Sequence, residues 1–209
     1  MNPKSRPMLF KTEMVQAILA GTKTQTRRLL KMPPKKLEHN SITNAYIGES
    51  GREYKCPYGQ VGDIIWVRET FQETTFLHVS DENYGYIYKA SENGREWEAN
   101  DESWKWKPSL FMPKKAARIF LEITDIRAER LNDISEGDAI AEGIGRWTEE
   151  RMTSKPIRYQ IYQSKKGDDS LYFSNPINSY ESLWESINGK GSWENNPYVW
   201  VITFKTKTV

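Results

Sequence analysis

The apolar residues of this chain come in short runs, and this pattern is what most limits the fold. The clearest run is 117–123, where alternate residues are apolar, as in a half-buried strand. Further short apolar runs predict strands at 61–68, 84–90 and 198–205. Strands therefore outnumber helices, and a regular series of strand–helix–strand units is excluded.

Only two segments have the apolar spacing of a longer amphipathic helix, 13–20 and 179–188. In the second, Ser179 is the expected cap, and Leu183, Trp184 and Ile187 are expected to pack into the body. A capping-box pattern at Ser135 predicts one more short helix. Together with the strands, these helices predict an α+β fold built on a small barrel or curled sheet.

The composition excludes several kinds of site. The 209 residues contain one cysteine and two histidines, which excludes a disulfide framework and any multi-Cys or His-rich metal site. We expect no metal and no cofactor. No apolar run approaches the length of a membrane-spanning helix, and the first eleven residues, with two prolines, do not resemble a signal peptide. We therefore expect a cytoplasmic protein without membrane partners.

The charge is unevenly distributed along the chain. Residues 1–60 contain eleven Lys/Arg and four Asp/Glu, whereas residues 61–209 contain nineteen and twenty-four. This asymmetry predicts a basic face that attracts phosphates, although a chance cluster of solvated charges would give the same count. The candidate nucleic-acid-binding residues are Arg27, Arg28, Lys31, Lys114, Lys115 and Arg118.

Tryptophans alternate with lysines in one polar stretch. Trp104 and Trp106 alternate with Lys105 and Lys107, and Trp97 lies shortly before them. Such a pattern suits bases stacked between phosphate contacts. The alternative is an insertion that its tryptophans attach to the body.

Four segments carry a family resemblance, in the same order as in that family. They are ILAGTKTQTRR at 18–28, YGQVGD at 58–63 with the strand 64–69 that follows, the short helix 134–143 that ends in Glu-Gly, and the closing strand 199–204. Together they resemble the ASCH domain family of the PUA-like superfamily.

The resemblance implies a fold and a class of partner. It implies one domain over 1–209, a PUA-like small β-barrel (pseudo-barrel) with flanking short helices. Long inserted loops would lie at about 29–57, 72–106 and 145–178. A cleft is expected beside the first helix. The superfamily includes RNA-binding proteins and readers of modified bases, so RNA or a modified nucleobase or nucleoside is the expected partner.

The resemblance also assigns candidate catalytic residues. Compact bacterial members of the family resemble amidohydrolases that act on N4-acylated cytidine through a Lys, a Thr and a Glu, which correspond to Lys23, Thr26 and Glu142. A lysine in a partly desolvated cleft has a lowered pKa and can accept a proton. Glu142 would end a helix, where a carboxylate needs a cationic partner. Residues three apart in an extended segment point to opposite faces, so Lys23 and Thr26 share a site only if the chain bends.

Three functions remain open from the sequence. The first is a nucleic-acid-binding protein that recognises RNA or a modified base, and the second is an amidohydrolase acting on a modified nucleobase. A weaker alternative is a nuclease acting on single-stranded RNA, but no histidine lies near the motif for a paired-histidine mechanism. The identity of the base, the choice between RNA and DNA, and the oligomeric state also remain open.

Overall fold

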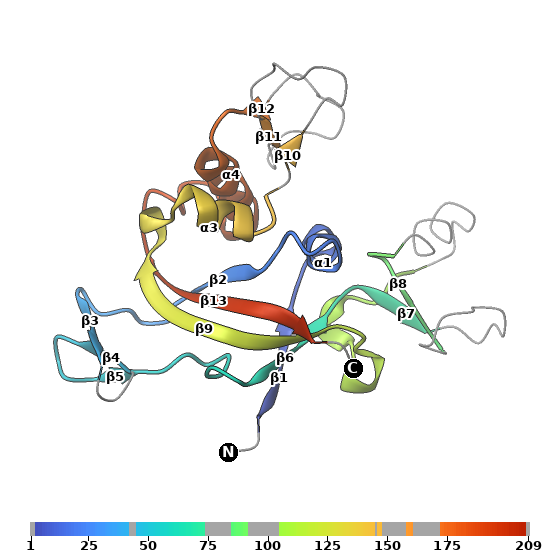
Figure 1. Cartoon of the computed structure of the whole chain (residues 1–209), viewed down its shortest axis with the longest axis horizontal. Helices are drawn as coiled ribbons and strands as arrows, with labels where there is room; N and C mark the ends of the chain where they lie inside the picture. Colours follow the sequence, from blue (N-terminus) through green and yellow to red (C-terminus); the bar gives the residue numbers. More distant parts are fainter. Residues whose placement is uncertain are drawn as a thin grey trace. The chain divides into compact units, whose positions relative to one another are not determined.

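The computed structural model describes residues 3–41, 45–73, 85–91, 105–144, 146–147, 158–160 and 172–207. In these ranges the protein is a mixed α+β protein with a five-stranded sheet and few short helices (Figure 1). Trp97 and Trp104, two of the candidate stacking residues, lie outside the described residues. None of the helices in the described ranges is long and apolar enough to cross a membrane.

The main sheet is formed by β1 (Ser5–Leu9), β2 (Gln25–Leu29), β6 (Ile64–Arg68), β9 (Phe120–Arg130) and β13 (Tyr198–Lys207). Its order is β1-β6-β9-β13-β2. The sheet is mixed, because β1 runs parallel to β6 whereas β6 and β9, and β13 and β2, are antiparallel pairs. Among the described strands β1 and β2 are the edges, so no closed barrel is seen there.

The chain divides into two compact units. The first unit contains residues 1–21, 58–125 and 204–209, and the second contains residues 22–57 and 126–203. Strands β9 and β13 contribute residues to both units.

The first unit is built around apolar residues of β6 and β9. The alternation predicted for 117–123 is confirmed, because Ile119, Leu121 and Ile123 are buried, although β9 itself begins at Phe120. Helix α1 (Thr12–Leu19) buries Val15. Two further strands, β7 (Phe71–Glu73) and β8 (Tyr86–Tyr88), pair in antiparallel fashion in this unit.

Asp63 fixes the turn that precedes β6. One oxygen of its buried carboxylate accepts a hydrogen bond from the Lys4 backbone N–H at 2.8 Å. The other accepts from Arg6 at 2.7 Å and from the Gln60 backbone N–H at 3.2 Å. Gly59 has φ 138°, and a Cβ there would lie 3.0 Å from the Asp63 carboxylate, so the turn requires a glycine at this position. The Gly-Asp turn thus ties β1 to the start of β6.

The second unit contains two helices that lie side by side, α3 (Glu136–Ala141) and α4 (Pro176–Asn188) (Figure 1). The predicted cap of α3 is confirmed, since the Ser135 side chain accepts the Asp138 N–H at 3.1 Å. Helix α4 instead begins after Asn175, which caps it through the Ile177 N–H, so the prediction of Ser179 as the cap is wrong.

The buried face of α4 ends one turn before the helix does. Leu183 and Trp184 are buried, as predicted, whereas Ile187 is 42% exposed. The buried residues of α4 extend only from Pro176 to Trp184. The last turn therefore extends past the part of the unit on which the helix packs.

All three of the expected inserted loops contain short strands, and β8 lies within 72–106. Within 29–57, the strands β3 (Leu37–Asn40), β4 (Ala45–Gly48) and β5 (Glu53–Tyr54) form an antiparallel sheet. Strands of two to four residues are too short to show an apolar period, which is why this segment resembled a loop. Within 145–178, β10 (Arg146–Trp147), β11 (Arg158–Gln160) and β12 (Tyr172–Phe173) form a second three-stranded sheet.

Candidate functional site

Backbone hydrogen bonding brings Lys23 and Glu142 of the second unit together. Lys23 precedes β2 and forms an isolated antiparallel bridge with Glu142. Beside it, the Thr24 N–H donates to the Ala141 carbonyl at 2.8 Å. Glu142 is the C-terminal cap of α3, and Gly143 follows it with φ 88°, a conformation that favours glycine. The bridge therefore holds the end of α3 against the start of β2.

The Lys23–Glu142 pair is buried and directly bonded. Lys23 Nζ donates to Glu142 Oε2 and to the Glu142 carbonyl, each at 2.7 Å. The Lys23 side chain has no exposed surface, and that of Glu142 is 3% exposed. Burial lowers the pKa of the Lys23 ammonium, and the nearby Glu142 carboxylate offsets only part of that shift. The site thus holds a lysine of reduced proton affinity against a carboxylate.

Arg27 binds the other oxygen of the same carboxylate. Its Nη1 donates to Glu142 Oε1 at 3.3 Å and to Gln25 Oε1 at 2.7 Å. Its Nε and Nη2 donate to Glu129 Oε1 at 3.2 and 2.6 Å. Burial opposes the charge of the guanidinium, but Glu142 and the other nearby groups outweigh it and raise the pKa of Arg27. Arg27 therefore remains charged and orients Glu142.

Ion pairs extend around Lys23 and Glu142. We call the following six side chains the Lys23–Glu142 network: Lys23, Arg27, Arg127, Glu129, Asp138 and Glu142. Arg127 donates to Glu129 and to Asp138, each at 2.9 Å. Burial would raise the pKa of Asp138, but the hydrogen bond from Gln25 and the two arginines outweigh it and lower that pKa. Three cations thus face three anions within the network, and the charge of Arg28 also acts on Lys23 from outside it.

Tyr180 of α4 lies beside Arg27 of the network. The Arg27 guanidinium lies 5.8 Å from the centre of its ring, which is a cation–π distance. Burial, together with the Glu142 carboxylate, raises the pKa of the Tyr180 hydroxyl well above 10.0. Tyr180 is therefore a neutral, buried group beside the charges.

The structure does not place Thr26 with Lys23 and Glu142. In β2, Gln25 and Arg27 extend to the network, and alternation sends Thr26 to the opposite face. There it lies across from Ile202 of β13 in the strand register. Both hydrogen bonds of the Lys23 ammonium go to Glu142. The described residues thus bring together two of the three candidate catalytic residues.

The candidate nucleic-acid-binding residues fall into different environments. In the second unit, Arg27 is buried in the network, Arg28 is half-buried and Lys31 is exposed. In the first unit, Lys114 and Lys115 are exposed, whereas Arg118 forms a bidentate ion pair with Glu69, with both hydrogen bonds at 2.9 Å. Lys31, Lys114 and Lys115 are therefore the exposed members of the set, and Arg28 is partly accessible.

Sequence reasoning did not find Gln25, Arg127, Glu129, Asp138 and Tyr180 as site residues. One signal was available, because Lys23, Gln25 and Arg27 recur at every second position, the period of one face of a strand. Arg127 and Glu129 recur in the same way on β9. No local pattern in the sequence indicates that this face of β2 contacts this face of β9, since about a hundred positions separate the two strands.

The network can hold a proton or hydrogen-bond a polar ligand. A carboxylate that accepts and an ammonium that donates match the donor and acceptor groups on a base edge. Within the described ranges, no three His, Cys, Asp or Glu side chains gather closely enough to hold a metal ion. No protein-family model, no curated protein and no solved structure matches this chain.

Proposed function

We propose that this protein is an ASCH-type nucleic-acid-binding protein that recognises RNA or a modified base at Lys23 and Glu142. The observation that carries the proposal is the buried Lys23–Glu142 bond, at 2.7 Å, with Arg27 on the other carboxylate oxygen. Removing such charges from water is costly, and apolar residues would hold the same elements together equally well. A recognition role accounts for the retention of these charges.

The chemistry of the pair favours a base as the ligand. A carboxylate accepts a hydrogen bond from the exocyclic amine of cytosine, and an ammonium donates to ring nitrogens and carbonyl oxygens. Since the Lys23 side chain has no exposed surface, a ligand reaches it only in a state in which the surrounding chain has opened. The ligand then stabilises that open state by its differential affinity.

We propose the finer fold on the same basis. The resemblance calls for a PUA-like small β-barrel (pseudo-barrel) with flanking short helices. The mixed five-stranded sheet with few short helices supports that assignment, and closure between the edge strands β1 and β2 is the part of the proposal that goes beyond the strand order.

A second candidate function is an amidohydrolase acting on an N4-acylated cytidine. It is favoured by burial of Lys23, which lowers the pKa of the ammonium and makes the amine available as a base. In that reaction Lys23 takes a proton from water while the water oxygen bonds to the acyl carbon. The carbon–nitrogen bond then breaks, and a proton held by Glu142 or Lys23 passes to the leaving amine. Because Thr26 lies on the opposite face of β2, water rather than Thr26 is the nucleophile.

One panel of ligands tests both functions. The protein is incubated with cytidine, N4-acetylcytidine and short RNA and DNA strands, with binding measured by calorimetry and turnover by mass spectrometry. A binding protein retains a ligand unchanged, and Lys23→Met and Glu142→Gln each lose that affinity. Lys55→Ala is the control, since this exposed lysine pairs with Glu53 outside the network.

If the protein is an amidohydrolase, it should release acetate and cytidine from N4-acetylcytidine. Lys23→Met should lose this activity and Thr26→Val should retain it. If every ligand is neither bound nor turned over, or if folded Lys23→Met behaves as the parent, the network is structural and both functions are rejected.

A further inference from the structure

A second surface, in the first unit, combines unpaired positive charge with exposed apolar side chains. Residues 105–118, which we call the 105–118 segment, contain five Lys/Arg and no Asp/Glu. In the described part of the chain, ion pairs engage two of the five, Lys107 with Glu73 and Arg118 with Glu69. Lys114 and Lys115 are exposed. The segment therefore presents an excess of positive charge to solvent.

Phe111 is held in a fixed position with most of its side chain in water. It is 68% exposed, and its neighbour Leu110 is 57% exposed. Arg68 donates hydrogen bonds to the carbonyls on both sides of it, that of Leu110 and, at 3.1 Å, that of Met112. Met112 itself is buried, so it anchors the turn. The exposure of Phe111 is thus imposed by the fold around it.

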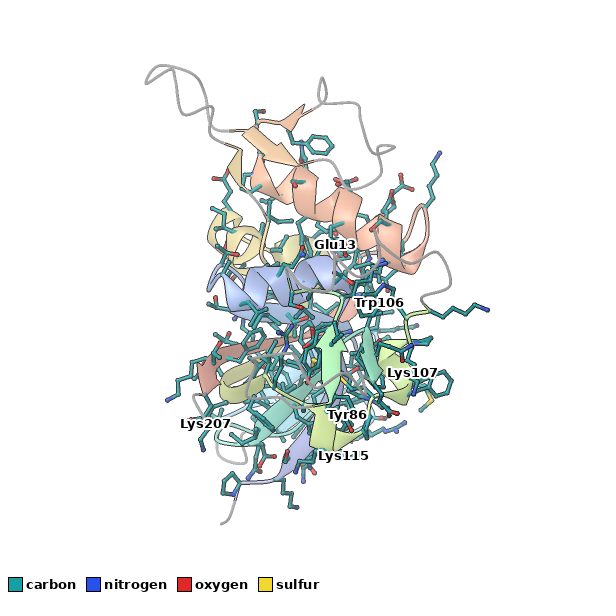
Figure 2. The ribbon with its side chains drawn as sticks, turned by 90° about the vertical axis from the view of Figure 1, so that its right-hand side faces the viewer. Glu13, Tyr86, Trp106, Lys107, Lys115 and Lys207 are labelled. Atoms are coloured by element: carbon teal, nitrogen blue, oxygen red, sulfur yellow. The ribbon has the colours of Figure 1, made fainter. Side chains whose placement is uncertain are left out.

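Both ends of the 105–118 segment are also attached to the unit. At one end, Lys107 exchanges two backbone hydrogen bonds with Phe71, at 2.8 and 3.2 Å. At the other, the Tyr88 hydroxyl donates to the Ala116 carbonyl at 2.7 Å. Figure 2 labels Lys107 and Lys115 on the side of the ribbon that faces the viewer, with Trp106 and Tyr86. The surface is therefore ordered before any partner arrives, which reduces the entropy lost on binding.

We propose that the 105–118 segment binds single-stranded nucleic acid, with a base stacked on Phe111 and phosphates at Lys114 and Lys115. Excess lysine charge attracts the phosphate backbone, and an exposed ring offers a stacking face to any base. A duplex keeps its bases stacked on one another, so the ring selects single strands. The proposal shares only its class of ligand with the proposed function and does not depend on the Lys23–Glu142 pair.

The test is fluorescence anisotropy with a labelled oligouridine RNA and with a duplex of the same length, on the full chain. Phe111→Ala is expected to weaken single-strand binding about tenfold, within the range that base–aromatic stacking supplies. Phe111→Trp should restore it, and Phe111→Leu should not, because leucine retains an apolar side chain without a stacking face. Since Phe111 is exposed, all three variants are expected to fold, and thermal unfolding checks this.

The lysines are tested by the salt dependence of the same binding. Lys114→Ala with Lys115→Ala should reduce the slope of log K against log salt by about 1.4, at about 0.7 for each phosphate contact on a single strand. The control replaces Lys4 and Lys11, two exposed lysines of the same unit outside the segment, and should leave the slope near that of the parent.

Three results would overturn the proposal: equal affinity for duplex and single strand, full binding by Phe111→Leu, or an unchanged slope in the double lysine variant. Full binding by Phe111→Leu would show that the RNA is bound without a base stacked on this ring. Failure of the proposed function is a separate result, because Lys23→Met would then bind modified bases as the parent does, whatever happens at Phe111.

Discussion

The Lys23 ammonium bonds the Glu142 carboxylate at 2.7 Å although 119 positions separate the two residues in the chain. The same ammonium donates to the carbonyl of Glu142. One lysine therefore serves both the side chain and the main chain of the residue that caps α3. A carboxylate at that end of a helix is opposed by the helix dipole, and a cation bound to the last carbonyl compensates it. Stability and any chemistry at Glu142 thus depend on the same lysine.

A double-mutant cycle on this pair separates its structural role from its function. Lys23→Met leaves a buried carboxylate with Arg27 as its remaining cation, and we expect a loss of about 3–5 kcal/mol in the free energy of unfolding. Lys23→Met with Glu142→Leu removes both buried charges, and most of that loss should be recovered. Urea unfolding of the parent, both single variants and the double variant measures the coupling. Additive single effects would show that the pair contributes no coupling energy.

The stability contributed by Lys23 should depend on pH in a defined direction. Because burial lowers its folded pKa below the ordinary 10.5, the unfolded chain binds more protons between the two values. Stability from this residue is therefore present above 10.5 and is lost as the pH falls through the folded pKa. The free energy of unfolding of the parent relative to Lys23→Met should rise with pH in the range below 10, by at most about 1.4 kcal/mol per pH unit.

The raised pKa of Tyr180 does not mask this effect. A tyrosine that keeps its proton when folded reduces stability only above its ordinary pKa of 10.0, outside the measured range. A difference between parent and Lys23→Met that is constant with pH would mean that Lys23 keeps its charge throughout.

The sequence predicted the elements whose pattern is local. Alternation predicted the buried face that holds Ile119, Leu121 and Ile123, and a capping box predicted the start of α3 at Ser135. Strands β3, β4 and β5 were missed, because two to four residues with few apolar side chains carry no period. The start of α4 was misplaced by one turn, although a local signal was present, because Asn175 is an acceptable cap and Pro176 after it is favoured at the first helical position.

The site depends on contacts that no local pattern encodes. The family resemblance named Lys23 and Glu142, and the structure places them in contact. It also named Thr26, which strand alternation puts on the other face of β2. The partners Glu129 and Asp138 come from β9 and α3, and only the tertiary fold pairs them with Arg27.

The two adjacent arginines of β2 should have different effects when replaced. Arg27 is buried against three carboxylates, so Arg27→Gln leaves these three anions with only Lys23 and Arg127 as partners and should cost about 3–5 kcal/mol of unfolding free energy. Arg28 is half-buried and its charge lowers the pKa of Lys23 from nearby, so Arg28→Gln should raise that pKa while leaving the Lys23–Glu142 bond in place. We expect Arg28→Gln to affect nucleic-acid binding instead, and to reduce the slope of log K against log salt by about 0.7 at most. Denaturant unfolding and RNA titrations over a range of salt concentrations measure the two effects. A lower salt slope in a stably folded Arg27→Gln variant would contradict this assignment.

In the first unit, Asp63 should make the stability sensitive to acid. Its carboxylate accepts hydrogen bonds from the Lys4 and Gln60 N–H groups and from Arg6. Burial opposes its charge, but the three donors outweigh it and lower the pKa of Asp63 below 3.8. The unfolded chain therefore takes up a proton first, and stability is lost as the pH falls through the folded pKa.

Asp63→Asn tests this role of the carboxylate. The amide group turns an N–H toward at least one of the three donors, and we expect a loss of about 1.5–3 kcal/mol at neutral pH, typical of hydrogen bonds to a charged group. Arg6→Gln is the matched control: its pair with Asp63 is 35% exposed on the arginine side, and such pairs contribute about 1 kcal/mol or less. Urea unfolding at neutral pH and near pH 3 should show that acid destabilises the parent more than Asp63→Asn. Equal acid sensitivity in both would assign the acid response to other carboxylates and leave Asp63 only a neutral hydrogen-bonding role in the turn.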